Sequence, residues 1–199
     1  MKNILCFVAS VIFTMNLAIA SGIEADIKEF ATREHPNDPQ MQQYTYKKQI
    51  SAYHYLSTVQ DTELKEFSLR EYPNDYAMQK YTYDKQLAAK RYMKSVDDAE
   101  VKTFSLREYP YDYSMQKYTY EKQISAKRYM STVDDKEVKD FSLRAYPYDY
   151  SMQKYTYDKQ LSAKEYMMSV PNQDAKEKAY RAYPYDHSMQ KYTYDRIAY

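Results

Sequence analysis

The stretch YPYDYSMQKY at residues 109–118 decides the fold, because close copies of it recur along the whole chain. Related stretches begin at residues 35, 72, 146 and 183, so that successive copies are 37 residues apart. The same proline stands in all of them, at Pro36, Pro73, Pro110, Pro147 and Pro184. A fixed period over five copies is typical of a repeat architecture, in which each copy packs on its neighbours in the same way.

Each copy is predicted to contain two helices. In the third copy we expect the first helix at about 97–108, with Asp97 as its N-cap. It should end before Pro110, because a residue that precedes proline is driven out of the α region. The second helix should run over about 112–132 and begin at an aspartate cap. The five predicted caps of second helices are Asp38, Asp75, Asp112, Asp149 and Asp186.

The second helix has apolar residues on two sides of a helical wheel. They are Met115, Tyr118, Ala126 and Tyr129 on one side and Tyr113, Tyr120 and Ile124 on the other. Two such faces favour a helix that packs both on its partner helix and on the neighbouring copy. We therefore expect an all-α fold, an α-solenoid of five two-helix repeats with a 37-residue period. Within it, Tyr118, Tyr120 and Tyr129 should lie in the core.

The first twenty residues have the pattern of a signal peptide. Lys2 is followed by an apolar run over 4–13 and by the small-x-small end Ala18-Ile19-Ala20. The run is too short for a membrane span, which needs about 20 apolar residues. We expect cleavage after Ala20, a periplasmic or secreted chain without a membrane span, and no disulfide, since the only cysteine is Cys6. The array then covers 21–199, with copies at approximately 21–59, 60–96, 97–133, 134–170 and 171–199.

The composition argues against several classes of protein. Without Lys2 the acidic and basic residues balance at 28 each, and neither sign forms a long run. This distribution disfavours binding to nucleic acid. The only glycine is Gly22, and His35, His54 and His187 stand without cysteine or a repeated metal-ligand spacing. We therefore expect no enzyme, no cofactor and no metal site.

The predicted architecture resembles helical-hairpin repeat families such as tetratricopeptide and Sel1-like arrays, and this resemblance implies binding of peptides or protein partners. It covers the whole array but is architectural only, because the period is 37 rather than 34 residues and the small residues of those families are absent. The motif Tyr-Pro-x-Asp-x-x-Met-Gln-x-Tyr also resembles one in uncharacterised exported bacterial proteins, which implies no activity.

Tyrosine is the candidate ligand-binding residue, with 27 occurrences in a chain that has no tryptophan. Asn37 and Asn74 give way in later copies to Tyr111, Tyr148 and Tyr185. A side chain that asparagine can replace is not essential to a core, so we expect these tyrosines at one edge of the array. The neighbours expected beside them are Tyr76, Tyr113 and Tyr150. Regularly spaced tyrosine can hold a glycan ring or a peptide, although repeat duplication explains a tyrosine-biased surface equally well.

A repeated cation in the second helix also has two interpretations. Its members are Lys48, Lys85, Lys122, Lys159 and Arg196. They could line a binding groove, or their stems could cover tyrosine rings while the charge reaches water, and we favour the second interpretation.

The sequence thus predicts a monomeric, exported, non-enzymatic scaffold that binds a protein, peptide or cell-wall glycan through a tyrosine-lined edge. The alternative is a structural protein that assembles into a surface layer or matrix. A third possibility, an enzyme, would have to use His54 or His187.

Overall fold

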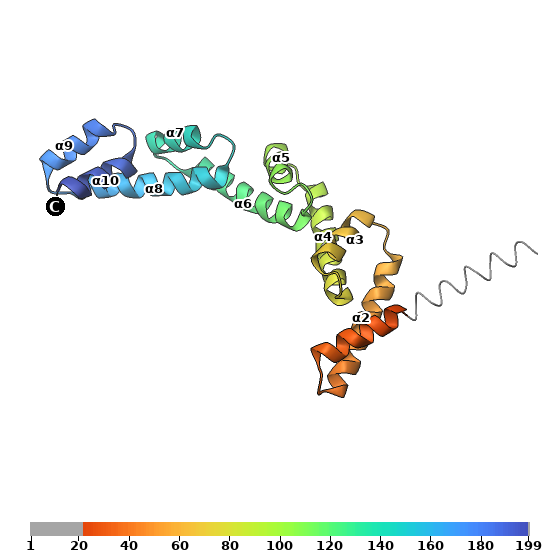
Figure 1. Ribbon diagram of the computed structural model, residues 1–199. Helices are drawn as coiled ribbons and strands as arrows, with labels where there is room; N and C mark the ends of the chain where they lie inside the picture. The colour runs from red at the N-terminus through yellow and green to blue at the C-terminus, as the bar shows by residue number, and fades with distance from the viewer. Residues whose placement is uncertain (1–21, 199) are drawn as a thin grey trace, which may run out of the picture. The chain divides into compact units, whose positions relative to one another are not determined.

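The computed structural model describes residues 22–198, which form helices joined by short turns (Figure 1). The predicted signal peptide and Cys6 lie outside the described residues. A first helix covers 22–34. It is followed by α2 (Pro39–Thr58), α3 (Thr62–Glu71), α4 (Tyr76–Ser95), α5 (Ala99–Glu108), α6 (Tyr113–Thr132), α7 (Lys136–Ala145), α8 (Tyr150–Ser169), α9 (Gln173–Ala182) and α10 (His187–Ile197). Short and long helices therefore alternate, as the sequence predicts.

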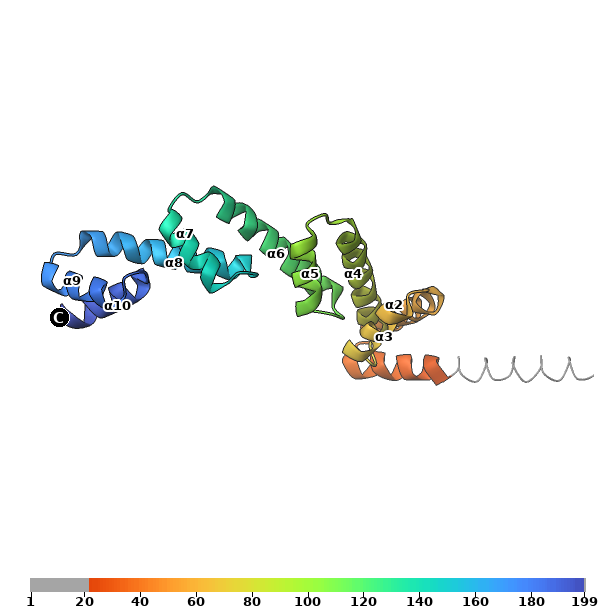
Figure 2. The same cartoon turned by 90° about the horizontal axis from the view of Figure 1, so that it is seen from above.

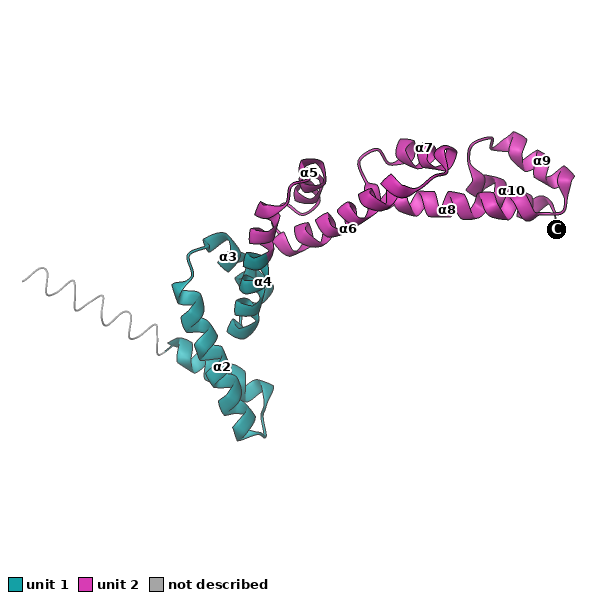
Figure 3. Ribbon diagram, turned by 180° about the vertical axis from the view of Figure 1, so that it is seen from behind, with its two compact units in different colours: residues 1–88 teal, residues 89–199 magenta. Residues whose placement is uncertain are grey.

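The chain divides into two compact units, residues 1–88 and 89–199, with the boundary inside α4 (Figure 3). In the second unit each short helix packs on the long helix that follows it, α5 on α6, α7 on α8 and α9 on α10. Successive long helices also pack on each other, α6 on α8 and α8 on α10 (Figures 1 and 2). This serial packing of helix pairs confirms the predicted all-α, solenoid fold class.

Aspartate side chains start the long helices at the positions that the sequence predicts. The Asp112 carboxylate accepts a hydrogen bond from the Met115 backbone N–H at 3.0 Å. Asp38, Asp75, Asp149 and Asp186 make the corresponding bond in their own copies. Each cap satisfies a backbone donor that would otherwise lack a partner at the helix start.

The cap predicted for the first helix of the third copy is wrong by one residue. Asp98 rather than Asp97 accepts the hydrogen bond from the Val101 N–H, at 3.1 Å, because α5 begins at Ala99. The helix ends at Glu108, just before the tyrosine and proline of the loop, as expected.

Each long helix buries a single stripe. In α6 the stripe consists of Gln116, Tyr120, Gln123, Ala126 and Met130, and α8 buries the equivalent residues Gln153, Tyr157, Gln160, Ala163 and Met167. The prediction that Tyr118 is a core residue is wrong, because 60% of it is exposed, and Tyr129 is only half-buried. A helical wheel oriented by apolar residues alone misplaces this stripe, because glutamine occupies two of its five positions.

Candidate functional site

A buried glutamine joins consecutive copies within each compact unit. Where the third and fourth copies meet, the Gln123 amide donates to the cap Asp149 at 2.7 Å and accepts from the Ser151 N–H at 3.2 Å. The same pair of bonds links Gln49 to Asp75 and Ala77, and Gln160 to Asp186 and Ser188. Because a buried amide without partners costs about 1–3 kcal/mol, these bonds fix how far one copy is displaced from the next.

A second glutamine, buried in every copy but the first, closes the hairpin within each copy. The Gln116 side chain donates to the backbone carbonyl of Tyr109 at 2.7 Å, at the C-terminal end of the short helix. Gln42, Gln79, Gln153 and Gln190 make the equivalent bond in the other copies. Glutamine therefore holds both the turn inside a copy and the junction between copies, a role that the sequence analysis missed although both glutamines recur at the 37-residue period.

A tyrosine, a lysine and an aspartate add a polar network to the first, third and fourth junctions. Tyr166 of α8 donates to Asp195 of α10 at 2.7 Å, while Lys191 donates to the same carboxylate at 2.6 Å. The Lys191 ammonium also lies 4.3 Å from the centre of the Tyr166 ring. The hydrogen bonds from Lys191 and Tyr166 lower the pKa of Asp195. The equivalent residues are Tyr55, Lys80 and Asp84 at the first junction and Tyr129, Lys154 and Asp158 at the third.

A lysine late in the long helix forms the other polar contact of the junction. Lys127 of α6 donates to Asp98 at 2.9 Å and to Glu100 at 3.0 Å. Tyr150 of α8 donates to the same Glu100 at 2.8 Å, and its ring centre lies 5.0 Å from the Lys127 ammonium. These bonds lower the pKa of both carboxyl groups and raise that of Lys127. Tyr150 is thus part of the junction.

The six tyrosines predicted as a binding surface fall into two groups. Tyr111, Tyr148 and Tyr185 are the most exposed aromatic residues of the described chain, at 72%, 69% and 69%. Their hydroxyls make no hydrogen bond with any residue between 22 and 198. We call these three residues the loop edge.

The other three predicted residues face neighbouring copies. The Tyr76 ring meets the Tyr53 ring edge-on, with centres 5.3 Å apart, and burial followed by the influence of Tyr53 raises its pKa. The Tyr113 ring lies 4.9 Å from the Lys90 ammonium, and Tyr150 has the contacts given above. The structure therefore does not place these three with the loop edge as one free surface.

Tyr148 stands in a groove between α5 and the loop that leads into α8. On one side of it a cavity of about 300 Å³ is lined by Arg107, Tyr146 and Pro147, among others. On the other side a cavity of about 360 Å³ is lined by Glu100, Thr103 and Phe104, among others. The Arg107 guanidinium lies 5.2 Å from the centre of the Phe104 ring, so an aromatic ring and a cation form the floor beside the exposed tyrosine.

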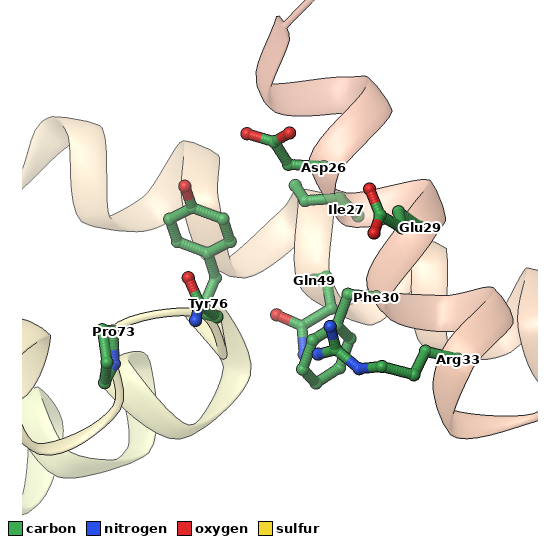
Figure 4. Close-up of a pocket in the computed structure, with 9 residues that line it drawn as sticks. Asp26, Ile27, Glu29, Phe30, Arg33, Gln49, Pro73 and Tyr76 are labelled. Carbon is green, nitrogen blue, oxygen red and sulfur yellow. The ribbon is translucent and has the colours of Figure 1, made fainter.

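The corresponding groove of the first junction contains asparagine in place of tyrosine. There a cavity of about 320 Å³ is lined by Asp26, Phe30, Arg33, Asn74 and Tyr76, among others. Figure 4 shows Phe30 and Arg33 side by side on the helix over 22–34, with Tyr76 across from them. The same Phe and Arg floor thus occurs at two junctions, and the residue at the loop position differs between them.

A second set of exposed tyrosines was missed by the sequence analysis. It consists of Tyr44, Tyr81, Tyr118, Tyr155 and Tyr192, which are 54–61% exposed. The repeated cations from Lys48 to Arg196 stand four residues after them and are exposed as well. None of the four repeated lysines places its ammonium over a tyrosine ring within residues 22–198, whereas Arg196 lies 5.6 Å from the centre of the Tyr192 ring. Lysines that do lie over tyrosine rings include Lys80, Lys117, Lys154 and Lys191. The signal for this set was a tyrosine and a cation at a constant spacing in all five copies.

The histidines have no shared site. His54 is exposed, whereas His187 is buried at the position that tyrosine occupies in α6 and α8, with its Nδ1 2.9 Å from Gln190 Oε1. No group of three or more His, Cys, Asp or Glu side chains within residues 22–198 is arranged to hold a metal ion. None of the helices in this part of the chain is long and apolar enough to cross a membrane.

The fold and these surfaces define an α-solenoid repeat protein with regularly spaced, exposed tyrosines. Comparison with protein-family models, with curated protein sequences and with solved structures finds no match. The function must therefore be argued from the surfaces themselves.

Proposed function

We propose that this chain is an exported, non-enzymatic scaffold that binds a protein or peptide partner through the loop edge. The observation that carries this proposal is the exposure of Tyr111, Tyr148 and Tyr185, at about 70% each, without a hydrogen bond to the described chain. Tyrosine offers a large, rigid contact area at a low cost in conformational entropy, which is why binding loops are rich in it.

The grooves beside the loop edge support a peptide-like partner. Two cavities flank Tyr148, and their floor joins the Phe104 ring to the Arg107 guanidinium. An extended segment could place a side chain in each cavity, with Tyr148 between them. Aromatic residues and arginine are also the residue types that contribute most to protein interfaces.

The test compares two triple variants with the unmodified protein. The first replaces Tyr111, Tyr148 and Tyr185 by asparagine, which the first two copies already contain at this position. The second replaces Tyr81, Tyr118 and Tyr155 by asparagine, and so removes the same number of exposed rings from the long helices. Circular dichroism checks that both remain helical.

Each protein is used to capture partners from an extract of the producing cells' envelope and, separately, on purified cell-wall glycan. We expect the loop-edge variant to retain less than a tenth of the captured protein partner and the long-helix variant to retain most of it. Equal capture by the unmodified protein and the loop-edge variant would contradict the proposal. Capture of cell-wall glycan alone, lost in the loop-edge variant, would replace the peptide by a glycan as the ligand.

A further inference from the structure

Each long helix carries an exposed tyrosine and, four residues later, an exposed cation. We call them the helix-face pairs, and they are Tyr44 and Lys48, Tyr81 and Lys85, Tyr118 and Lys122, Tyr155 and Lys159, and Tyr192 and Arg196. Residues four apart on an α-helix lie on the same face, one turn from each other. In the fifth copy the two side chains touch, since Arg196 donates to the Tyr192 hydroxyl at 3.3 Å and stacks 5.6 Å from the ring centre.

These pairs do not serve the packing of the array. In the first four copies neither the tyrosine hydroxyl nor the lysine ammonium bonds to any residue of the described chain. Side chains this exposed contribute little to folding, since substitutions at such positions usually change stability by less than about 0.5 kcal/mol. Yet both positions keep their chemical character in all five copies, whereas other exposed positions change, as Asn74 does to Tyr111. A contact outside the chain would explain why they recur.

The charge of the cations remains available to a ligand. In the second to fifth copies the acidic residue directly before the cation is already paired with another lysine, as Asp84 is with Lys80 at 2.6 Å and Asp195 with Lys191 at 2.6 Å. Glu121 and Asp158 are held in the same way. In the first copy the acidic residue is replaced by Lys47. Each pair therefore presents an aromatic ring and an unneutralised cation.

The pairs of one unit follow a regular path. Gln123 contacts Ser151 and Tyr129 contacts Asp158, so α6 and α8 run parallel, with contact partners 28–29 residues apart. Equivalent residues are 37 positions apart, whereas contacting residues are 28–29 apart. Each long helix is therefore displaced along its axis by roughly nine residues, or about 13 Å, relative to the previous long helix. With a lateral spacing of about 8–10 Å between packed helices, successive pairs on α6, α8 and α10 lie roughly 16 Å apart.

We infer that the helix-face pairs bind an acidic polysaccharide, with the tyrosine ring against the face of a sugar and the cation on its carboxylate. A tyrosine and a cation at the same spacing in every copy suit a polymer of identical units better than a peptide of varied sequence. The ring supplies an apolar face with a polar rim, which matches a sugar, and the ammonium or guanidinium pairs with an anion. The fifth copy has arginine in place of lysine and so keeps the positive charge.

The inference is tested with three soluble polymers and the purified protein. Polygalacturonate carries a carboxylate on every sugar, its methyl ester has the same sugars without the charge, and poly-L-glutamate has the charge without sugars. We expect polygalacturonate to bind at least ten-fold more tightly than either control, with an affinity that falls as salt is added. Equal binding of the methyl ester would exclude the role of the cation, and equal binding of poly-L-glutamate would exclude the role of the ring.

Matched variants locate the binding. Replacing Tyr118, Tyr155 and Tyr192 by glutamine, or Lys122, Lys159 and Arg196 by glutamine, should each weaken polygalacturonate binding at least ten-fold, because contacts along one polymer reinforce each other. The control replaces the exposed Lys65, Lys94 and Lys136 by glutamine, which makes the same change in net charge as the cation variant. This control should retain most of the affinity for polygalacturonate. An equal loss in this control would overturn the inference.

The loop-edge variant distinguishes this inference from the proposed function. It should bind polygalacturonate as the unmodified protein does, because the helix-face pairs are intact. Failure of polygalacturonate binding would leave the loop-edge proposal standing, and failure of partner capture would leave the helix-face inference standing.

Discussion

At the scale of single residues, the same amino acid has opposite roles at positions only two apart. Tyr120 is 6% exposed and its hydroxyl accepts a hydrogen bond from the Asp98 N–H at 3.4 Å, whereas Tyr118 is 60% exposed. Two residues correspond to about 200° around a helix, so the two side chains leave it on nearly opposite sides. Exposure, rather than residue type, separates the tyrosines that hold the fold from those available to a ligand.

This contrast predicts two very different mutational effects. Tyr120→Ala should lower the free energy of unfolding by about 3 kcal/mol, because it removes a buried ring and leaves a cavity. Tyr118→Ala should change it by less than about 0.5 kcal/mol. Urea unfolding followed by circular dichroism measures both. Similar losses for the two variants would show that the buried stripe is assigned incorrectly.

The buried glutamines give a second prediction. Gln123→Met keeps a similar volume but removes the bonds to Asp149 and to the Ser151 N–H, so we expect a loss of about 1–3 kcal/mol in the free energy of unfolding. Lys122→Met, one residue earlier and exposed, is the control and should be nearly neutral. Equal stability of Gln123→Met and the unmodified protein in urea would argue against the junction described above.

These residues also show what the sequence could and could not predict. The aspartate caps were predictable, because a short acceptor side chain before a helix has one local function. The loop-edge tyrosines could be placed outside the core because asparagine replaces them in two copies. The buried stripe could not be placed, because a wheel weighted by apolarity gives glutamine no core position. Only the hydrogen bonds across the junction reveal why an amide is buried there.

At the scale of elements, neighbouring helices are joined by carboxyl groups that must be ionised. Hydrogen bonds from lysine lower the pKa of Asp98, Asp135 and Asp195 in the folded chain. For Asp158, burial acts to raise the pKa, but the bonds from Lys154 and Tyr129 outweigh it. A carboxyl group whose pKa is lowered by folding stabilises the fold above its unfolded pKa of about 3.9, and this contribution is lost as the pH falls through the folded value.

We therefore expect the free energy of unfolding to fall as the pH is lowered below about 4. Lys127→Met removes the donor that lowers the pKa of Asp98 and Glu100, so this variant should be less stable at pH 7 and should lose less on acidification. Urea unfolding of both proteins between pH 2 and 7 provides the comparison. Parallel pH profiles would show that the Lys127 bonds do not stabilise the junction.

The tyrosines of the junction predict a separate effect at high pH. The hydrogen bond to Asp158, followed by burial, raises the pKa of Tyr129 to about 12. Its unfolded pKa is about 10, so the stabilisation is complete below pH 10 and is lost between pH 10 and 12. Tyr129→Phe lacks this titration and should lose less stability over that range. Thermal unfolding of both proteins between pH 9 and 12 tests this prediction. The same pH profile for Tyr129→Phe and the unmodified protein would contradict a stabilising hydrogen bond between Tyr129 and Asp158.

At the scale of the whole molecule, the first copy differs from the later copies at the positions that contact the preceding copy. Pro39, Gln43 and Lys47 stand at the positions of Tyr150, Lys154 and Asp158. A preceding copy would meet a lysine where its tyrosine hydroxyl needs a carboxylate. The first copy therefore lacks the residues with which later copies contact the copy before them.

This difference predicts a chain that stays monomeric in solution. Sedimentation equilibrium and light scattering should give the mass of one chain over a hundred-fold range of protein concentration. A mass that grows with concentration would favour the structural alternative, and the ends of the assembling units would then have to be mapped.

The central feature of the molecule is the division between tyrosines that hold the array and tyrosines that we propose contact a ligand. Hydroxyl-radical footprinting with mass spectrometry measures it most directly, in the free protein and in the protein with its captured partner. We predict strong labelling of Tyr111, Tyr148 and Tyr118 in the free protein, weak labelling of Tyr120 and Tyr157, and loss of labelling at Tyr111 and Tyr148 when the partner is bound. A bound partner that leaves the labelling of both loop-edge residues unchanged would contradict the account.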